Sequence, residues 1–235
     1  MTASSATGSA PRTRAYVPLL GAAVFLLAYL AVSPVADAIA PLPLPDAPTA
    51  EVYAYFTDHG AASIVTGILQ LLSVAGFALF LTATLRHAIA SPQRRACRVL
   101  GWIAVAAMVV SCAIAIWLPL AAAGLSSDAV EAWRQASFYA GGVVHIVALG
   151  GFVLTVALWR SWTRPVRVMA WIAAVPALLS IASLLWYYAS ILLPAGRLLA
   201  MLAFIVAGVS LVRSRSRARF AAMMEGTEIS NGAPR

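Results

Sequence analysis

The chain has 235 residues, of which 62% are hydrophobic and 10% charged, and its mean hydropathy is +0.89. Soluble domains are about half apolar and about a quarter charged, so this composition excludes a soluble globular domain and indicates an integral membrane protein. The formal net charge of +8 does not indicate nucleic-acid binding, because the arginines lie in short clusters beside apolar runs and form no basic helix or sheet pattern.

The sequence contains six apolar runs, each of a length suited to one membrane crossing. They lie near 15–34, 61–85, 99–121, 138–159, 168–190 and 195–212. About 20 residues span a hydrocarbon core as a helix, and a helix is the form in which such a run satisfies its own backbone hydrogen bonds in lipid. We therefore predict an all-α, polytopic bundle of six transmembrane helices, with a disordered leader at 1–14 and a basic tail at 213–235.

The arginines predict the orientation of this bundle, because positive residues beside short loops stay on the cytoplasmic side. Of the sixteen basic residues, all arginine, 14 fall in the leader, the tail or the connections between helices two and three and between four and five. Six of the eight acidic residues fall in the other connections. We expect both termini in the cytoplasm of a bacterial cell, with the helices in its inner membrane, since an all-arginine set of basic residues is typical of GC-rich bacterial genomes.

The first helix has a second interpretation as a cleaved signal peptide. Two arginines precede its apolar run, and the small residues Ala36 and Ala38 follow it, as at a cleavage site. The run is longer than a usual signal core, and Pro41 would directly follow an alternative site that ends at Ala40. These features favour a retained helix, with cleavage as the alternative.

The chain also carries an internal repeat. Residues 98–117 align with 167–186 without a gap and match at eight of twenty positions, including one arginine and two tryptophans at fixed spacing. The repeating unit is a helical hairpin, at 59–121 and 138–190, and both copies run in the same direction through the membrane, as in parallel repeats. Chance similarity between apolar helices is the alternative, but the shared arginine and tryptophans favour duplication.

Polar residues inside a membrane span are candidate functional sites by default. The predicted spans contain no acidic residue; the notable polar residues are Gln70, His145 and Arg197, all near the outer ends of their helices. We predict an outward-opening pocket that these three line together with Tyr187, in which the arginine suits an anionic head group. The alternative is that Gln70 and His145 hydrogen-bond across the bundle while Arg197 reaches the surface.

The sequence does not indicate a cofactor, a metal or a catalytic residue. The three histidines, His59, His87 and His145, lie at three depths, which disfavours haem ligation, and no spacing signal supports a zinc site. Cys97 and Cys112 lack CxxC spacing and are expected to pack in the bundle.

The overall pattern of basic leader, first helix, proline-rich outer loop and hairpins with arginine-rich turns resembles bacterial multi-pass membrane proteins grouped as domains of unknown function. The resemblance covers most of the chain, and its one motif is Arg-x3-Trp at Arg98 and Trp102 and again at Arg167 and Trp171. It implies no catalytic residue. We expect a non-enzymatic protein that binds, senses or moves a small amphipathic or lipid-like molecule; the alternatives are a structural or interaction subunit beside a membrane partner or a second copy, and then a membrane enzyme.

Overall fold

Long apolar stretches fold as helices in lipid, and helices dominate the computed structural model. The structure describes residues 16–43, 47–86 and 91–231. It describes the side chains of these residues except those of 187, 188 and 215–231. Within these ranges the chain is 88% helical and has no strand, which confirms the predicted all-α class. Six helices are long and apolar enough to cross a membrane, as predicted, so the chain is a multi-pass membrane protein.

The helices follow one another with short connections. The first span is α1 (Val17–Leu30) with α2 (Val32–Ala36), and the short α3 (Thr49–Asp58) precedes the hairpin of α4 (Gly60–Arg86) and α5 (Pro92–Ala121). The fourth span is α6 (Ser127–Ser137), a π-helical segment (Phe138–Val144) and α7 (His145–Leu158). α8 (Arg164–Leu179) then leads through 3-10 turns (Ser180–Leu184 and Tyr187–Ile191) into α9 (Leu192–Asn231).

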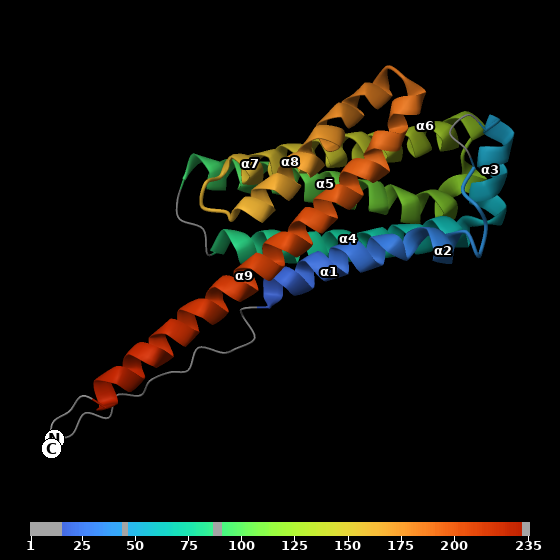
Figure 1. Ribbon diagram of the computed structural model, residues 1–235. Helices are drawn as coiled ribbons and strands as arrows, with labels where there is room; N and C mark the ends of the chain where they lie inside the picture. The colour runs from blue at the N-terminus through green and yellow to red at the C-terminus, as the bar shows by residue number, and fades with distance from the viewer. Residues whose placement is uncertain (1–15, 44–46, 87–90, 232–235) are drawn as a thin grey trace.

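The six spans form a closed ring. Each of α1, α4, α5, α7, α8 and α9 packs on the next, and α9 returns to α1 (Figure 1). α3 lies across one end of the ring, against α6 and the neighbouring ends of α4 and α5. The two hairpins predicted from the repeat, α4 with α5 and α7 with α8, are both present as packed pairs, while their origin by duplication stays a prediction.

Phenylalanine rings fill the middle of the ring of helices. Phe25 of α1, Phe77 and Phe80 of α4, Phe152 of α7 and Phe204 of α9 are at most 2% exposed, and their paired ring centroids lie 4.7–6.0 Å apart. Stacked and edge-on rings at these separations attract each other beyond the effect of burial alone. We call this group the phenylalanine cluster; it leaves the bundle axis closed at that level.

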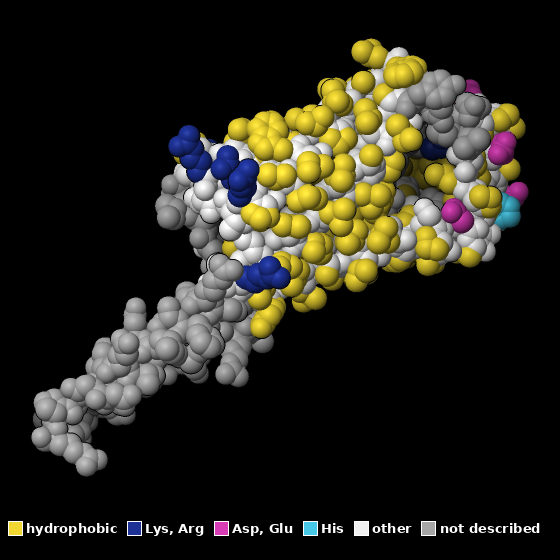
Figure 2. Space-filling model, viewed as in Figure 1, with side chains coloured by type: hydrophobic (Ala, Val, Ile, Leu, Met, Phe, Trp, Pro, Cys, Tyr) yellow, Lys and Arg dark blue, Asp and Glu magenta, His cyan; other side chains and the backbone are white. Residues whose placement is uncertain are grey.

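The two ends of the bundle differ in charge. Arginine side chains gather at one end and acidic and histidine side chains at the other, while apolar side chains cover the wall between them (Figure 2). We call them the arginine end, where α4 ends and α5 begins, and the acidic end, which carries α3. This polarity is the one expected from the alternation of charged connections in the sequence.

Several helix boundaries differ from those expected. α5 begins seven residues before 99, because Ser91 accepts a hydrogen bond from the Arg94 amide and Pro92 takes the first helical position. The fourth span begins at Ser127 rather than 138, because the amphipathic α6 continues into it. α8 ends at Leu179, three residues after Pro176, where the Ser180 hydroxyl donates to the Ala177 carbonyl.

Candidate functional site

A cavity of about 580 Å³ lies in the half of the bundle nearer the acidic end. Small-molecule sites usually occupy about 300–1,000 Å³, so the cavity is of a size that holds a ligand. Its wall comes from α1, the connection between α2 and α3, and α3, from α4, α5, α6, the π-helical segment and the start of α7, and from the 3-10 turn Tyr187–Ile191 and α9. A hollow is visible in the apolar wall near the acidic end, with a basic side chain inside it (Figure 2).

The structure brings two of the four predicted site residues to this cavity. Gln70 of α4 and Arg197 of α9 both line it, although 127 positions separate them in the sequence. The side chain of Tyr187 lies outside the described residues; Ser190, in the same 3-10 turn, lines the cavity. His145 does not line it.

Arg197 is buried and has few partners. Its residue is 6% exposed, one of its terminal nitrogens donates to the Met108 sulfur at 3.4 Å, and its guanidinium carbon lies 4.5 Å from the centroid of the Tyr29 ring. Its Nε has no hydrogen-bond partner. The ion pair found among the described residues joins Arg134 to Glu131 and does not involve Arg197. The alternative in which this side chain reaches the surface therefore does not hold.

His145 connects two helices instead of facing the cavity. Its residue is completely buried, and its Nδ1 lies 2.8 Å from the carbonyl oxygen of Ala104 on α5. A carbonyl oxygen only accepts, so Nδ1 donates and carries the proton, which leaves Nε2 as an acceptor without a partner. His145 thus makes a hydrogen bond across the bundle, as its alternative interpretation anticipated, but to the backbone rather than to Gln70.

Three of the five serine and threonine hydroxyl groups in the cavity wall are hydrogen-bonded within the chain. Ser63 donates to the Ala115 carbonyl at 2.7 Å and so ties α4 to α5. Ser111 of α5 and Ser137 of α6 bond to each other through both hydroxyl and carbonyl oxygens, at 2.9–3.2 Å. Gly141 has no side chain because a Cβ there would collide with the Ser111 hydroxyl. Gln70, by contrast, makes no side-chain hydrogen bond within the described part of the chain.

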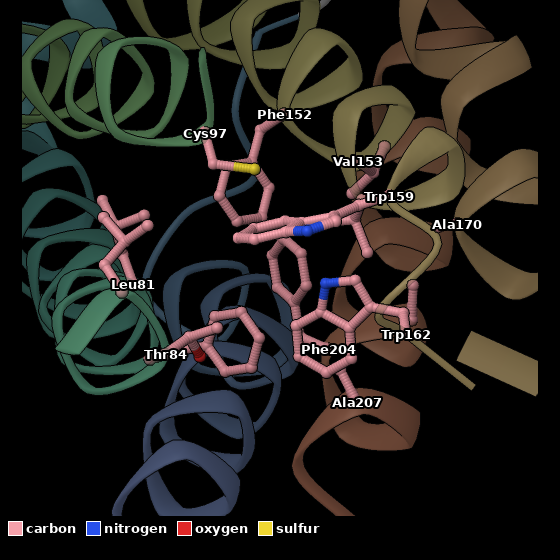
Figure 3. A pocket seen from close by; sticks show the side chains of 14 residues that line it. Leu81, Thr84, Cys97, Phe152, Val153, Trp159, Trp162, Ala170, Phe204 and Ala207 are labelled. Carbon is pink, nitrogen blue, oxygen red and sulfur yellow. The ribbon is translucent and has the colours of Figure 1, made fainter. Parts of the chain in front are cut away.

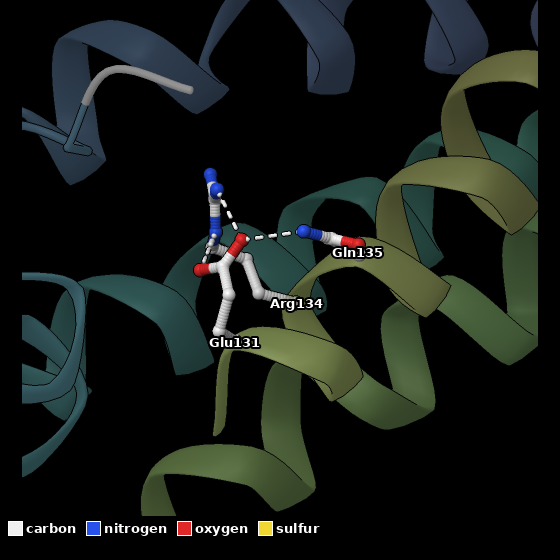
Figure 4. A network of polar contacts seen from close by, with 3 residues as sticks. All are labelled: Glu131, Arg134 and Gln135. Carbon is white, nitrogen blue, oxygen red and sulfur yellow. Dashed lines mark hydrogen bonds and ion pairs between the residues drawn. The ribbon is translucent and has the colours of Figure 1, made fainter. Parts of the chain in front are cut away.

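Arg134 is a second guanidinium in the cavity wall, and the sequence analysis did not single it out. Its Nε and one terminal nitrogen donate to the two carboxylate oxygens of Glu131 at 2.8 and 2.7 Å, and Gln135 donates to the same carboxylate at 3.0 Å (Figure 4). The i, i+3 spacing of Glu131 and Arg134 on the amphipathic α6 is the sequence signal that predicts this pair.

The acidic end of the cavity is covered by α3. Tyr55 and Phe56 line the cavity from this helix, each is 5% exposed, and their rings meet edge-on at 5.2 Å. They belong to an apolar cluster that includes Val52, Leu118 and Val130. Burial, with a smaller effect of the nearby Asp37 carboxylate, raises the pKa of Tyr55, so its hydroxyl stays protonated.

The pocket in the opposite half of the bundle is much smaller. A void of about 10 Å³ lies there, and the side chains of Trp159, Trp162, Cys97 and Thr84 surround it (Figure 3). That volume is about one water molecule's worth of accessible space, too small for an organic ligand. Cys97 and Cys112 are both buried with free thiols.

Within the described ranges, no group of three or more histidine, cysteine, aspartate or glutamate side chains is placed to hold a metal ion. No known protein family, no curated protein and no solved structure matches the chain.

Proposed function

We propose that this protein binds a small amphipathic molecule with an anionic head group in the cavity around Arg197, without catalysing a reaction. The observation that carries the proposal is the buried Arg197 guanidinium, which lines the cavity and has no carboxylate beside it in the described structure.

An unpaired cation inside a membrane span is costly. Insertion scales assign about 2.5–3.5 kcal/mol to an arginine at the centre of a membrane helix. A guanidinium has five N–H donors, and Arg197 uses one, toward the weak sulfur acceptor of Met108. A phosphate or carboxylate in the cavity would accept the others through charge-assisted hydrogen bonds, which contribute about 1.5–3 kcal/mol each.

The rest of the wall suits an apolar chain. Apart from Arg197, Arg134, Gln70 and the engaged serines, the lining is mostly apolar. A ligand with one charged end and one apolar end satisfies both parts of this surface. Gln70, with a free amide, is the second polar contact for the head group.

Binding fits the geometry better than passage through the membrane. The phenylalanine cluster fills the bundle axis between the cavity and the arginine end, so the cavity is closed on that side. The acidic end corresponds to the connections that the arginine distribution assigns to the outside of the cytoplasmic membrane. The cavity therefore faces outward in the proposed orientation.

A purely structural role has less support. Three glycines that could receive a partner helix are already covered within the chain. Added Cβ atoms at Gly67 and Gly76 would lie 2.7 Å from Ile116 and 2.5 Å from Phe25, and Gly196 packs as closely on Ala177.

Native mass spectrometry of the delipidated, detergent-purified chain tests the proposal. The probe is hexadecyl phosphate, compared with the uncharged hexadecanol. The variants are Arg197→Gln and, as a matched control on the same helix, the exposed Arg213→Gln. We expect Arg197→Gln to weaken hexadecyl phosphate binding about tenfold or more, the loss of one charge-assisted contact, and Arg213→Gln to leave it within about twofold. Equal binding by both variants would reject Arg197 as the binding group.

A further inference from the structure

We infer that the ligand is an anionic membrane lipid, which reaches Arg197 sideways from the bilayer through an opening between α1 and the first turns of α9. This inference rests on the proposed function and specifies its ligand class and the route of access.

The two helices that border the opening diverge toward the acidic end. Near the arginine end they touch backbone to backbone, since a Cβ at Gly208 would lie 2.8 Å from the Cα of Leu19. Tyr29 and Arg197 lie ten and eleven residues further toward the acidic end, about 15 Å along each helix. There, long side chains bridge the gap, with the guanidinium stacked on the tyrosine ring at 4.5 Å. Figure 1 shows the same divergence of α1 and α9.

The borders of the opening are apolar and exposed. Leu42 lines the cavity and is 61% exposed. Leu30, next to the lining residue Tyr29, is 51% exposed, and Ile191, next to the lining residue Ser190, is 71% exposed. Leu30 and Ile191 belong to membrane-spanning segments, where exposed apolar side chains face acyl chains, and Leu42 lies in the connection that follows the first span. In Figure 2 the hollow lies near the acidic end, where apolar side chains border it on the side of the wall.

The route from water is covered, in contrast to the side. α3 closes the acidic end through Tyr55 and Phe56, which pack on Leu118 of α5 and Val130 of α6, all at most 5% exposed. A water-borne anion would therefore have to displace this apolar cluster or cross the apolar border. A lipid already has its tail at the border and needs only to move its head group onto Arg197.

The test uses the full chain in phosphatidylcholine nanodiscs and compares two sources of the same phosphomonoester group. One arm adds dioleoyl phosphatidic acid to the nanodisc, and the other adds glycerol phosphate to the buffer. Native mass spectrometry after release from the disc counts the bound adducts. We expect phosphatidic acid to be retained and glycerol phosphate to bind at least about tenfold more weakly.

A pair of variants tests the side route itself. Ser190→Trp places a large ring in the cavity wall beside the opening, whereas Leu185→Trp places the same ring on the exposed surface five residues earlier, away from the cavity lining. We expect Ser190→Trp to weaken phosphatidic acid binding about tenfold and Leu185→Trp to change it by less than about twofold. The elution volume and thermal unfolding of both variants check that they fold.

The outcomes separate the two proposals. If glycerol phosphate binds as well as phosphatidic acid, in an Arg197-dependent way, the lipid route is wrong and the anion site stands. If neither probe binds, or if Arg197→Gln binds both as the parent does, the proposed function itself fails. Unchanged lipid binding by a folded Ser190→Trp variant would place the opening elsewhere and overturn this inference.

Discussion

Replacement of Arg197 by methionine should stabilise the empty protein and abolish its response to the ligand. Methionine keeps much of the length and the apolar surface of the side chain but removes the charge. Most single substitutions of buried residues are destabilising, so a gain in stability is an unusual outcome and a specific consequence of an unpaired buried cation.

The size of the effect follows from the contacts of Arg197. Removal of the charge recovers about 2.5–3.5 kcal/mol of insertion cost. Loss of the cation–π contact with Tyr29 offsets about 0.5–2 kcal/mol of this gain in stability. Loss of the weak hydrogen bond to the Met108 sulfur changes the balance little. The net expectation is a stabilisation of about 0.5–3 kcal/mol, which for a chain of this size raises the Tm by about 1–12 °C.

Thermal unfolding of the delipidated protein in detergent, with and without hexadecyl phosphate, measures both effects. A ligand at one thousand times its Kd stabilises the parent by about 4.1 kcal/mol. The order of stability should therefore reverse: the variant is more stable without ligand, and the parent is more stable with it. If the empty variant were less stable than the parent by more than about 1 kcal/mol, Arg197 would have a structural role, and the reasoning from an unpaired charge would be refuted.

Three further changes probe the other features. His145→Ala should lower the free energy of unfolding by about 1–3 kcal/mol, because the hydrogen bond to the Ala104 carbonyl is lost. It should leave the affinity for hexadecyl phosphate within about threefold, because His145 does not line the cavity. A large loss of affinity would contradict this placement. Gly76→Ala should destabilise by about 1–3 kcal/mol through collision with the α1 backbone, whereas Gly124→Ala, with nothing within 4 Å, should be neutral. Reporter fusions after Arg98 and Arg167 should both read as cytoplasmic, and opposite readings would invalidate the orientation.

The sequence was sufficient to predict the spans and two polar residues of the cavity wall. Length and apolar composition determine which segments cross the membrane, and these signals need no tertiary information. Gln70 and Arg197 were found because a polar residue inside a span is rare enough to be conspicuous. Tyr29 and Ser111 were missed, since aromatic and hydroxyl residues are common in membrane helices, and their role depends on which helices become neighbours.

His145 lies beside the cavity but faces α5. Its Nδ1 bonds to the Ala104 carbonyl, and a Cβ at Gly141, one turn earlier, would also meet α5, at the Ser111 side chain. The next residue, Ile146, lines the cavity. The sequence shows that a histidine lies inside the span, but which group its ring meets depends on how the helices pack.

The cavity lies where the two proposed hairpin copies differ most. In the first copy α4 and α5 are continuous helices, and Trp117 near the end of α5 packs edge-on against Trp133 of α6 at 5.1 Å. In the second copy the π-helical segment interrupts the entering helix, and α8 unwinds into 3-10 turns after Pro176, so that the aligned Trp186 has extended backbone angles and is 64% exposed. The irregular segments of the second hairpin contribute Phe138, Gly141, Gly142 and Ser190 to the cavity wall. This part of the wall therefore has no counterpart in the regular helices of the first hairpin, and a duplication, if it occurred, would not predict a second cavity of the same kind.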